Sequence, residues 1–539
     1  MTLSLAITLG HNSSAVAIED GHIMIGYEEE RFTTKKSDSS FPINSIEQIK
    51  SHFGVSKFDN LSIGHWFTAG ELVPSKYADF EYLNNLVPNP SCINSLMDGF
   101  THHDSHLLSA EVFAQYYDFP SNHLAIVADG FGTFGECVTL YHVNCTERKI
   151  LHRFFGFEKS LGLLYQYATA YLEMKMHNHE YKLLGYEAHI DKAISCEQKA
   201  NLNLEIQTHA SVWLKNMFDN PISKTFDQLV NVAALSAVQH EFNKIFDDVI
   251  EKIVPGVQDL VRRRIVIAYF VQGLVESVMK ALVDLYAPKA LLVSGGLFYN
   301  VKLNSLLADK VDKFCVMPLA GDQGAGLGVY EHYFGDLKWP GHLEWGFRNL
   351  KFETKDEDIV FTDDIEYMLD LVADELQTTG FVNLVRGAME FGPRSLCNTA
   401  TLAMPTEKSV DMINLMNDRT TIMPMAPVMT SEQIGSMLLD SEKIVGSLEY
   451  MIVTRDVKPG RDNDLLGASH YYSDSGRRTC RPQQISKMDP LECLVEEFGP
   501  LINTSFNFHG VPIVFDGKSI EYSHKKQNET SRIKTVVLY

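Results

Sequence analysis

Short apolar runs, each followed by a glycine-rich turn, recur three times along the chain and predict buried β-strands. The first run, within residues 3–30, is interrupted by a Gly-His-Asn-Ser-Ser turn and reverses at an Asp-Gly pair at 20–21, which is typical of a hairpin. The second ends at Asp129, and the third ends in Ser-Gly-Gly at 294–296, ahead of a helical pattern. Because glycine lets a backbone approach phosphates closely, the pattern indicates an α/β core that handles nucleotides.

The middle of the chain, at 205–290, has a mostly helical pattern, and its most apolar segment lies at 265–286. Charged residues at 276, 280 and 284 interrupt this segment, which argues against a membrane span. Apolar residues at helical spacing form one stripe: Ala268, Val271, Val275, Val278 and Leu282. The segment is therefore predicted to be a buried amphipathic helix.

The periodic patterns stop at residues 333–347, which are rich in glycine, proline and aromatic residues, and at the polar residues 351–360. A new α/β pattern starts near Asp364 and continues to residue 539. A chain of 539 residues is also too long for a single hydrophobic core. We therefore expect an α/β protein of two modules, at 1–345 and 360–539, joined by this irregular segment.

Charge and cysteine content narrow the class of protein. The formal net charge of −22 disfavours non-specific binding to nucleic acids, although a local basic pocket for a phosphorylated small molecule remains compatible with it. The eight cysteines are scattered without a C-x-x-C pair, which argues against zinc ribbons and a disulfide scaffold. The N-terminus lacks the basic region of a signal peptide. We expect a cytoplasmic protein with no membrane partner, as a monomer or homodimer.

Three histidines lie within five residues, in Thr-His-His-Asp-Ser-His at 101–106. If this segment starts a helix, His102 and His106 lie on one face about 6 Å apart along the axis, a spacing that allows both to bind one metal ion. His103 then points elsewhere. Taken alone, the segment favours solvated histidines at a helix N-terminus, because two histidines do not make a site.

Two carboxylates favour the metal site. Asp129 ends an apolar strand, where a buried charge needs a partner, and Asp322 follows another apolar run directly before glycines. Two imidazoles and two carboxylates suit a borderline divalent ion such as iron(II), manganese(II) or zinc(II). The candidate ligands are therefore His102, His106, Asp129 and Asp322.

With these motifs the chain resembles the O-carbamoyltransferase family that includes the nodulation, cephalosporin and tobramycin carbamoyltransferases. The motifs that carry the resemblance run in order along more than nine tenths of the chain. They are GHNSSA, EEERFTTKK, HHDSH, VADGFG, SLGLLY, EYKLLGYE, SGGLFYNVKLN, GDQGAGLG, MEFGPRSLCN, MPMAPV and INTSFNFHGVPIV.

The resemblance implies an actin-like ATPase module (ASKHA, RNase H-like) at the N-terminus and a YrdC-like α/β module at the C-terminus. It also implies that the four candidate ligands hold iron(II). In the chemistry of the family, carbamoyl phosphate and ATP, the latter with Mg²⁺, give carbamoyl adenylate and pyrophosphate. A hydroxyl of an acceptor then takes the carbamoyl group and AMP is released.

Several residues of this chain match family positions that take part in these two steps. His11 can act as general base on the acceptor hydroxyl, because an imidazole titrates near neutrality. The family motif usually has Asp where this chain has Asn12, so any contribution of that carboxylate is lost. Lys36 matches the lysine that reaches carbamoyl adenylate. The adenylate-binding turn matches Gly295, Gly296 and Asn300, and glycine there allows backbone N–H groups to meet a phosphate.

The C-terminal module must hold several phosphates, for which arginines and backbone nests are suited. The strongest candidate is Arg394 in FGPRSL. The remaining candidates for phosphate or the carbamoyl group are Arg419, Arg478, Arg481, Ser505 and Asn507.

Two departures from the family pattern affect this module. Thr399 lies where the family usually reads arginine in GNRS, and Met423 replaces the arginine of FRPFAP. Each lost charge-assisted contact is worth about 1.5–3 kcal/mol, so the activation step is either weakened or compensated by neighbours such as Arg477. The alternative interpretation of the function is therefore a non-catalytic or activation-impaired nucleotide-binding relative.

A hydrogenase-maturation carbamoyltransferase is a further alternative, but it requires an acylphosphatase domain and zinc-binding cysteine pairs that the sequence lacks. The acceptor is expected to carry its hydroxyl on a sugar, an antibiotic or a hydroxymethyl group. Hydroxymethylcytosine in a nucleotide or DNA belongs to this class, so nucleic acid is expected only as an acceptor.

Overall fold

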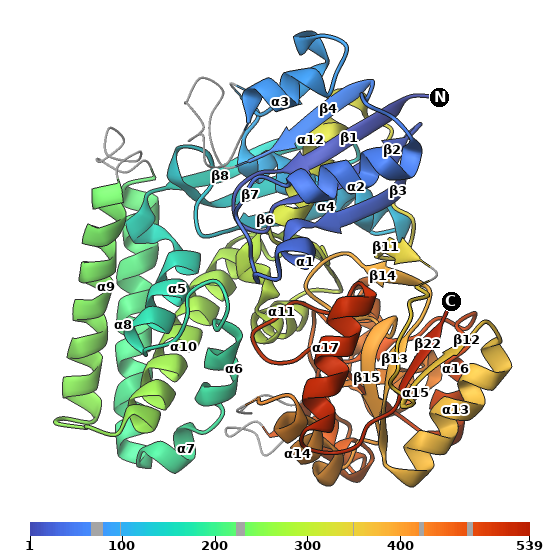
Figure 1. The fold of residues 1–539 in the computed structure, drawn as a ribbon. Helices are drawn as coiled ribbons and strands as arrows, with labels where there is room; N and C mark the ends of the chain where they lie inside the picture. The colour runs from blue at the N-terminus through green and yellow to red at the C-terminus, as the bar shows by residue number, and fades with distance from the viewer. Residues whose placement is uncertain (66–78, 98, 222–231, 349, 420–424, 472–477) are drawn as a thin grey trace.

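The computed structural model describes residues 1–65, 79–97, 99–221, 232–348, 350–419, 425–471 and 478–539 (Figure 1). The N-terminal half contains two five-stranded sheets with two helices between them, and a bundle of long helices on one side. A separate seven-stranded sheet with its helices forms the C-terminal part.

The first sheet has the order β3-β2-β1-β4-β5. Its strands are β1 (Leu3–Thr8), β2 (Ser14–Glu19), β3 (His22–Glu28), β4 (Asn60–Gly64) and β5 (Ile93–Ser95). The first three are antiparallel, whereas β4 and β5 continue parallel to β1. The predicted hairpin turn is confirmed, because Asp20 and Gly21 join β2 to β3 with φ values of 47° and 81°, as a type I′ turn requires.

The second sheet repeats this topology, with the order β10-β9-β6-β7-β8. Its strands are β6 (Asn122–Ala128), β7 (Glu136–Asn144), β8 (Glu147–Phe155), β9 (Ala290–Ser294) and β10 (Lys313–Val316). Again three antiparallel strands come first and two parallel strands follow. A duplicated sheet of this order is the RNase H-like arrangement of an actin-like module, so the predicted α/β fold class is confirmed.

Two helices, α4 (His102–Tyr116) and α12 (Ala325–Phe334), lie between the sheets. The glycines of GDQGAGLG allow their close packing. A Cβ on Gly328 would lie 1.8 Å from the Ser105 carbonyl oxygen of α4, and one on Gly326 would lie 2.7 Å from the Ile7 oxygen of β1. This motif therefore seats α12 against both α4 and the first sheet.

The helical region is formed mainly by α8 (Cys196–Asp219), α9 (Val232–Ile253) and α10 (Leu260–Tyr286). The predicted apolar stripe of α10 is confirmed, because all five of its residues are fully buried. By length and composition alone α10 could cross a membrane, but it packs against α8 and against α6 (Tyr181–Glu187) inside the protein. The remaining helices of this half are α1 (Glu29–Thr33), α2 (Ile43–Phe53), α3 (Phe80–Asn85), α5 (Leu161–Tyr171), α7 (Ile190–Ala193) and α11 (Val301–Ala308).

The C-terminal sheet is mixed, with the order β12-β22-β13-β15-β21-β16-β20. Its strands are β12 (Ile359–Thr362), β13 (Phe381–Val385), β15 (Thr399–Ala403), β16 (Ala426–Met429), β20 (Gln483–Gln484), β21 (Leu501–Ser505) and β22 (Thr535–Leu538). A small sheet adds β17 (Arg455–Asp456), β18 (His470–Tyr471) and β19 (Arg478–Cys480). The helices are α13 (Ile365–Thr378), α14 (Glu407–Met416), α15 (Ser431–Met437), α16 (Glu492–Phe498) and α17 (Gly517–Asn528).

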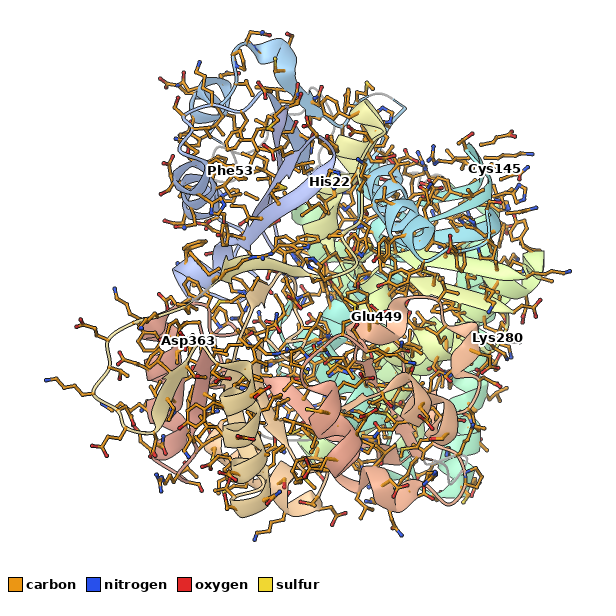
Figure 2. All side chains as sticks on the ribbon, turned by 90° about the vertical axis from the view of Figure 1, so that its right-hand side faces the viewer. His22, Phe53, Cys145, Lys280, Asp363 and Glu449 are labelled. Atoms are coloured by element: carbon orange, nitrogen blue, oxygen red, sulfur yellow. The ribbon has the colours of Figure 1, made fainter. Side chains whose placement is uncertain are left out.

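The segment expected to be an irregular junction is partly ordered. β11 (Glu344–Arg348) pairs with β14 (Ala388–Glu390), and Trp339 and Trp345 are buried. Further along the chain, Glu449, which Figure 2 labels, accepts a hydrogen bond from Tyr117 at 2.8 Å, so the second half also contacts the C-terminal end of α4. The expected limits of 1–345 and 360–539 stay a prediction.

A buried ion pair joins the two halves. Arg31 lies 3.0 Å from Glu28 and donates to the carbonyl oxygens of Gly392 at 2.9 Å and Ile513 at 3.1 Å. Glu28 in turn accepts from the Gly392 N–H at 3.0 Å. Helix α1 is therefore fixed to the C-terminal module by charge-assisted hydrogen bonds.

Arg31→Met is expected to lower the free energy of unfolding by about 3–5 kcal/mol, because it leaves Glu28 buried without its cation. Thermal and urea unfolding measure the change. The double variant Glu28→Gln/Arg31→Met should be less destabilised than Arg31→Met, since it removes the uncompensated charge. Equal stabilities of Arg31→Met and the unchanged protein would contradict this account of the interface.

Candidate active site between the two modules

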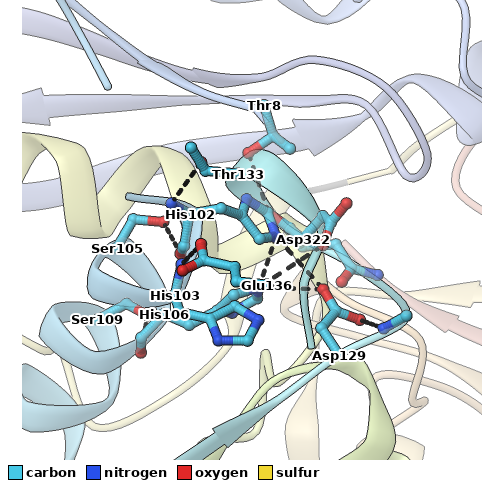
Figure 3. Close-up of polar contacts among 12 residues, drawn as sticks. Thr8, His102, His103, Ser105, His106, Ser109, Asp129, Thr133, Glu136 and Asp322 are labelled. Atoms are coloured by element: carbon cyan, nitrogen blue, oxygen red, sulfur yellow. Dashed lines mark hydrogen bonds and ion pairs between the residues drawn. The ribbon is translucent and has the colours of Figure 1, made fainter. Parts of the chain in front are cut away.

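Four side chains converge where the two N-terminal sheets face each other: His102, His106, Asp129 and Asp322 (Figure 3). Their ligand atoms all lie within 4.8 Å of one another. His102 Nε2 lies 3.3 Å from Asp129 Oδ2 and 3.4 Å from Asp322 Oδ1, and His106 Nε2 lies 3.1 Å from His102 Nε2. The structure thus brings together all four residues that the sequence predicted as metal ligands, with both histidines buried.

Local structure explains why α4 presents these histidines. Thr101 and Asp104 form a capping box that starts the helix. The next free backbone donors are also satisfied, because the His102 N–H donates to Thr133 Oγ1 at 3.0 Å and the His103 N–H donates to Glu136 Oε1 at 2.9 Å. The helix terminus is therefore held rigidly against the start of β7, and the His102 and His106 rings meet one turn apart.

Contacts outside the cluster orient its rings. His102 Nδ1 lies 3.0 Å from the carbonyl oxygen of His65, directly after β4, which leaves Nε2 free to face the carboxylates. His103 turns away as predicted, with Nδ1 2.8 Å from Thr139 Oγ1. The His65 carbonyl that orients His102 belongs to the backbone, so the sequence carries no side-chain signal for it.

The electrostatics favour a cation at the centre. Burial opposes the charged form of His102, but the Asp322 and Asp129 carboxylates raise its pKa well above the ordinary value. Burial also opposes ionisation of Asp129, but hydrogen bonds to the two histidines hold the pKa of its carboxyl well below the usual range. Two carboxylates facing two imidazoles that lie side by side form a donor set that fits one divalent ion, whose binding would release protons.

The glycine turn after β9 packs against this cluster. A Cβ on Gly295, where φ is 101°, would lie 2.3 Å from the Ala128 carbonyl oxygen, and one on Gly296 would lie 2.8 Å from Asp129 Oδ1. Asn300 follows, but its side chain accepts from the Leu303 N–H at 3.0 Å to cap α11 and donates to Gln272 at 2.8 Å. The turn is therefore adjacent to the predicted metal site, whereas Asn300 has a structural role in this conformation.

His11 and Lys36 lie on two loops of the N-terminal half. Thr8, just before the His11 turn, donates to the Asp322 carbonyl oxygen at 3.2 Å, which ties the end of β1 to the second carboxylate ligand. The Lys36 loop is held by Ser37, whose hydroxyl donates to the His177 carbonyl oxygen at 2.9 Å. Burial, and then the charge of Arg419, lower the pKa of Lys36 to about 8. Lys36 therefore lies close enough to Arg419 of the C-terminal module for the two positive charges to repel each other.

Arg419 is surrounded by neutral acceptors. It donates to Thr504 Oγ1 at 2.8 Å, to Asn507 Oδ1 at 2.8 Å and to the Ser505 carbonyl oxygen at 3.0 Å. The Ser505 hydroxyl donates to Asn507 Oδ1 at 2.6 Å. Burial lowers the pKa of Arg419 to about 10. Three of the predicted phosphate-binding residues therefore form one cluster.

Arg394 and Arg481 form a second cationic group. Burial lowers the pKa of Arg481 to about 9, with a further contribution from the charge of Arg394, and burial lowers the pKa of Arg394 as well. The Nε atom of Arg394 is buried without a hydrogen-bond partner. In the described parts of the chain, no carboxylate lies within 4.0 Å of Arg394, Arg419 or Arg481. Such uncompensated cations indicate a site for an anion.

The remaining residues discussed from the sequence belong to neither of these two cationic groups. Arg478, on β19, donates to Ser469 Oγ at 3.2 Å. Thr399 donates to Glu390, which also accepts from three backbone N–H groups between residues 396 and 399. Met423 and Arg477 lie outside the described residues.

His177, whose ring centroid lies 4.6 Å from that of His11, is not among the site residues predicted from the sequence. The only signal was the pair of histidines in His-Asn-His at 177–179, which has no metal-ligand spacing and lies far from His11 in sequence. Because the loops that contain His11 and His177 come together only in the folded chain, no local pattern predicts this contact.

Comparison with known families supports the interpretation of both halves. Residues 92–329 match the family model for the carbamoyltransferase N-terminus, and residues 373–537 match that for the carbamoyltransferase C-terminus. An uncharacterised protein of Methanocaldococcus jannaschii is 28% identical over 538 residues, covering 95% of each chain. The nodulation protein NolNO of Sinorhizobium fredii is 24% identical, covering 95% of this chain and 76% of that protein.

Solved structures are similar only weakly. Full-length HypF in its phosphate- and nucleotide-bound form gives a TM-score of 0.31 at 13% identity, covering 60% of this chain and 54% of that one. A ROK family glucokinase from Streptomyces griseus gives a TM-score of 0.27 at 11% identity, covering 61% of this chain and 98% of that one. Scores this low support no conclusion, so the fold class follows from the strand order and the two family models.

Proposed function

The chain belongs to the carbamoyltransferase family, and we propose that it activates a carbamoyl group with ATP and transfers it to a hydroxyl of an acceptor. Water first cleaves carbamoyl phosphate to carbamate and phosphate. A carbamate oxygen then attacks the α-phosphorus of ATP, which forms carbamoyl adenylate and expels pyrophosphate. In the second step the acceptor oxygen attacks the carbamoyl carbon, AMP leaves and the hydroxyl proton is transferred to a base.

The observation that carries this proposal is the set of arginines without carboxylate partners. Arg394, Arg419 and Arg481 present positive charge that no described acid neutralises, and the charge of Lys36 from the other module lies near Arg419. Carbamoyl phosphate and ATP are both multiply charged anions that can supply the missing counter-charges. We assign the activation step to these residues, with Ser505 and Asn507 as hydrogen-bonding neighbours.

We assign the metal role to His102, His106, Asp129 and Asp322, whose donor set fits iron(II), manganese(II) or zinc(II). When bound, such an ion supplies positive charge beside the phosphate of the leaving AMP. Gly296 lies against Asp129 and Gly295 against Ala128, and we assign their backbone N–H groups to the same phosphate.

His11 is assigned as the general base of the transfer step, because its turn follows Thr8, whose hydroxyl donates to the carbonyl oxygen of Asp322. We predict that His11→Asn abolishes transfer while pyrophosphate is still formed from ATP and carbamoyl phosphate. Separate measurements of radiolabelled pyrophosphate and of AMP show which of the two steps the variant still performs. Loss of both products in His11→Asn would refute it.

The charge of Lys36 makes the reaction sensitive to alkaline pH. With a pKa of about 8, the ammonium loses its proton as pH rises through this value, and its attraction for the adenylate phosphate disappears. We expect the apparent KM for ATP to rise above about pH 8. In Lys36→Arg the charge persists, so the rise should be absent up to at least pH 9. Identical pH profiles of the two proteins would rule out this role of Lys36.

The acceptor can be identified by mass spectrometry. The protein is incubated with ATP, carbamoyl phosphate and a panel of sugars, antibiotics and hydroxymethyl nucleosides, and products with one added carbamoyl group are sought. A carbamoylated product with equimolar AMP supports the proposal. ATP binding without pyrophosphate would instead support the nucleotide-binding alternative, which the contact of Thr399 with Glu390 in place of a phosphate-binding arginine favours.

A further inference from the structure

We propose that His177 is a positioning residue for His11, whose ring it holds in the orientation needed for carbamoyl transfer. This inference depends on the proposed function, in which His11 is the base. The two ring centroids lie 4.6 Å apart and the ring planes are inclined by 88°, so one imidazole edge meets the face of the other. Edge-to-face contacts at this distance are a favourable geometry for aromatic pairs.

The contact matters because His11 lacks the usual means of orientation. A histidine that acts as base normally has its second ring nitrogen hydrogen-bonded to a carboxylate or a backbone carbonyl. In the described structure the Nδ1 atom of His11 is buried and has no hydrogen-bond partner. The neighbouring residue, where a carboxylate could have served, is Asn12. Ring packing against His177 therefore takes the place of a hydrogen bond in fixing the imidazole plane.

The backbone of His177 is held in a conformation that is unfavourable for a side chain. Its φ is 63°, in the left-handed region. Two neighbours secure it, because Glu180 accepts from the His177 N–H and Ser37 donates to the His177 carbonyl oxygen at 2.9 Å. Such conformations persist where the surrounding structure imposes them, and they are concentrated at functional sites.

The charge state of His177 is compatible with this role. Burial, and then the proximity of His11, lower the pKa of His177 to about 4, whereas Asp322 and Asp129 act in the opposite direction. Its ring is therefore neutral at pH 7 and does not repel the proton that His11 must accept. A neutral ring can hold its neighbour by packing alone.

The test separates ring packing from a purely structural role. His177→Gly removes the ring and also relieves the positive φ, so the melting temperature should stay the same or rise. AMP release with water or glycerol as acceptor should nevertheless fall about 10- to 100-fold. His177→Phe keeps an aromatic ring and should retain transfer within about threefold. Glu173→Gly relieves a similar φ of 59° four residues earlier and should leave both steps unchanged.

The activation step provides the internal reference. Carbamoyl-phosphate-dependent exchange of labelled pyrophosphate into ATP should be unchanged in all His177 variants. When His177→Gly is combined with His11→Asn, AMP release should be no slower than in His11→Asn alone. Unimpaired AMP release in His177→Gly would overturn the inference, as would His177→Phe that is as slow as His177→Gly. Absence of exchange in the unchanged protein would instead refute the proposed function.

Discussion

His106→Ala is expected to remove the divalent ion and to slow carbamoyl transfer by at least about 100-fold. The four donors lie within 4.8 Å of one another and His106 is fully buried, so alanine at this position leaves only three of the four donors. Loss of groups that merely orient ligands already costs about 10- to 100-fold in affinity or activity, and loss of a ligand should cost more. Elemental analysis of the purified variant gives the metal content, and AMP release gives the rate.

His103→Gln is the matched control for this experiment. His103 lies in the same helical turn and is also buried, but its Nδ1 faces Thr139 Oγ1 at 2.8 Å, away from the carboxylates. The His103→Gln variant should keep the bound ion. If His106→Ala, or the unchanged protein treated with a chelator, transferred the carbamoyl group at full speed, the assignment of the cluster would be wrong.

Arg394→Met is expected to have opposite effects on activity and stability. Methionine removes a cation that has no carboxylate partner, so the melting temperature should be unchanged or higher. Pyrophosphate formation should fall about 10- to 150-fold, because one charge-assisted contact of about 1.5–3 kcal/mol is lost. Differential scanning fluorimetry and a coupled pyrophosphate assay measure the two effects on the same preparation.

Arg455→Met is the control for the loss of a buried arginine. Arg455 is paired with Asp309 at 2.9 Å and donates to the Leu439 carbonyl oxygen at 3.0 Å. Its removal should lower the melting temperature and leave pyrophosphate formation unchanged. If Arg394→Met instead destabilised the protein and formed pyrophosphate normally, Arg394 would be a structural residue.

The four candidate metal ligands could be named from the sequence because each has a local signal. The spacing of His102 and His106 fixes one helix face, and Asp129 and Asp322 each follow an apolar run. The hairpin at 20–21 and the buried stripe of α10 were predictable for the same reason, since their periods of two and 3.6 residues appear directly in the sequence.

Other features depend on tertiary packing and have no local signal. Trp339 and Trp345 are buried in a segment without periodicity, because β11 pairs with β14 more than forty residues away. The repeated strand order of the two N-terminal sheets leaves no repeat in the sequence beyond the glycine turns. The contact of His11 with His177 arises from loops that only the folded chain brings together.

The central claim is that this protein forms carbamoyl adenylate before an acceptor is needed. The most direct measurement is the exchange of radiolabelled pyrophosphate into ATP, with and without carbamoyl phosphate and with no acceptor present. We predict incorporation of label that requires carbamoyl phosphate and is strongly reduced in Arg394→Met. Absence of incorporation, or equal incorporation without carbamoyl phosphate, would contradict it.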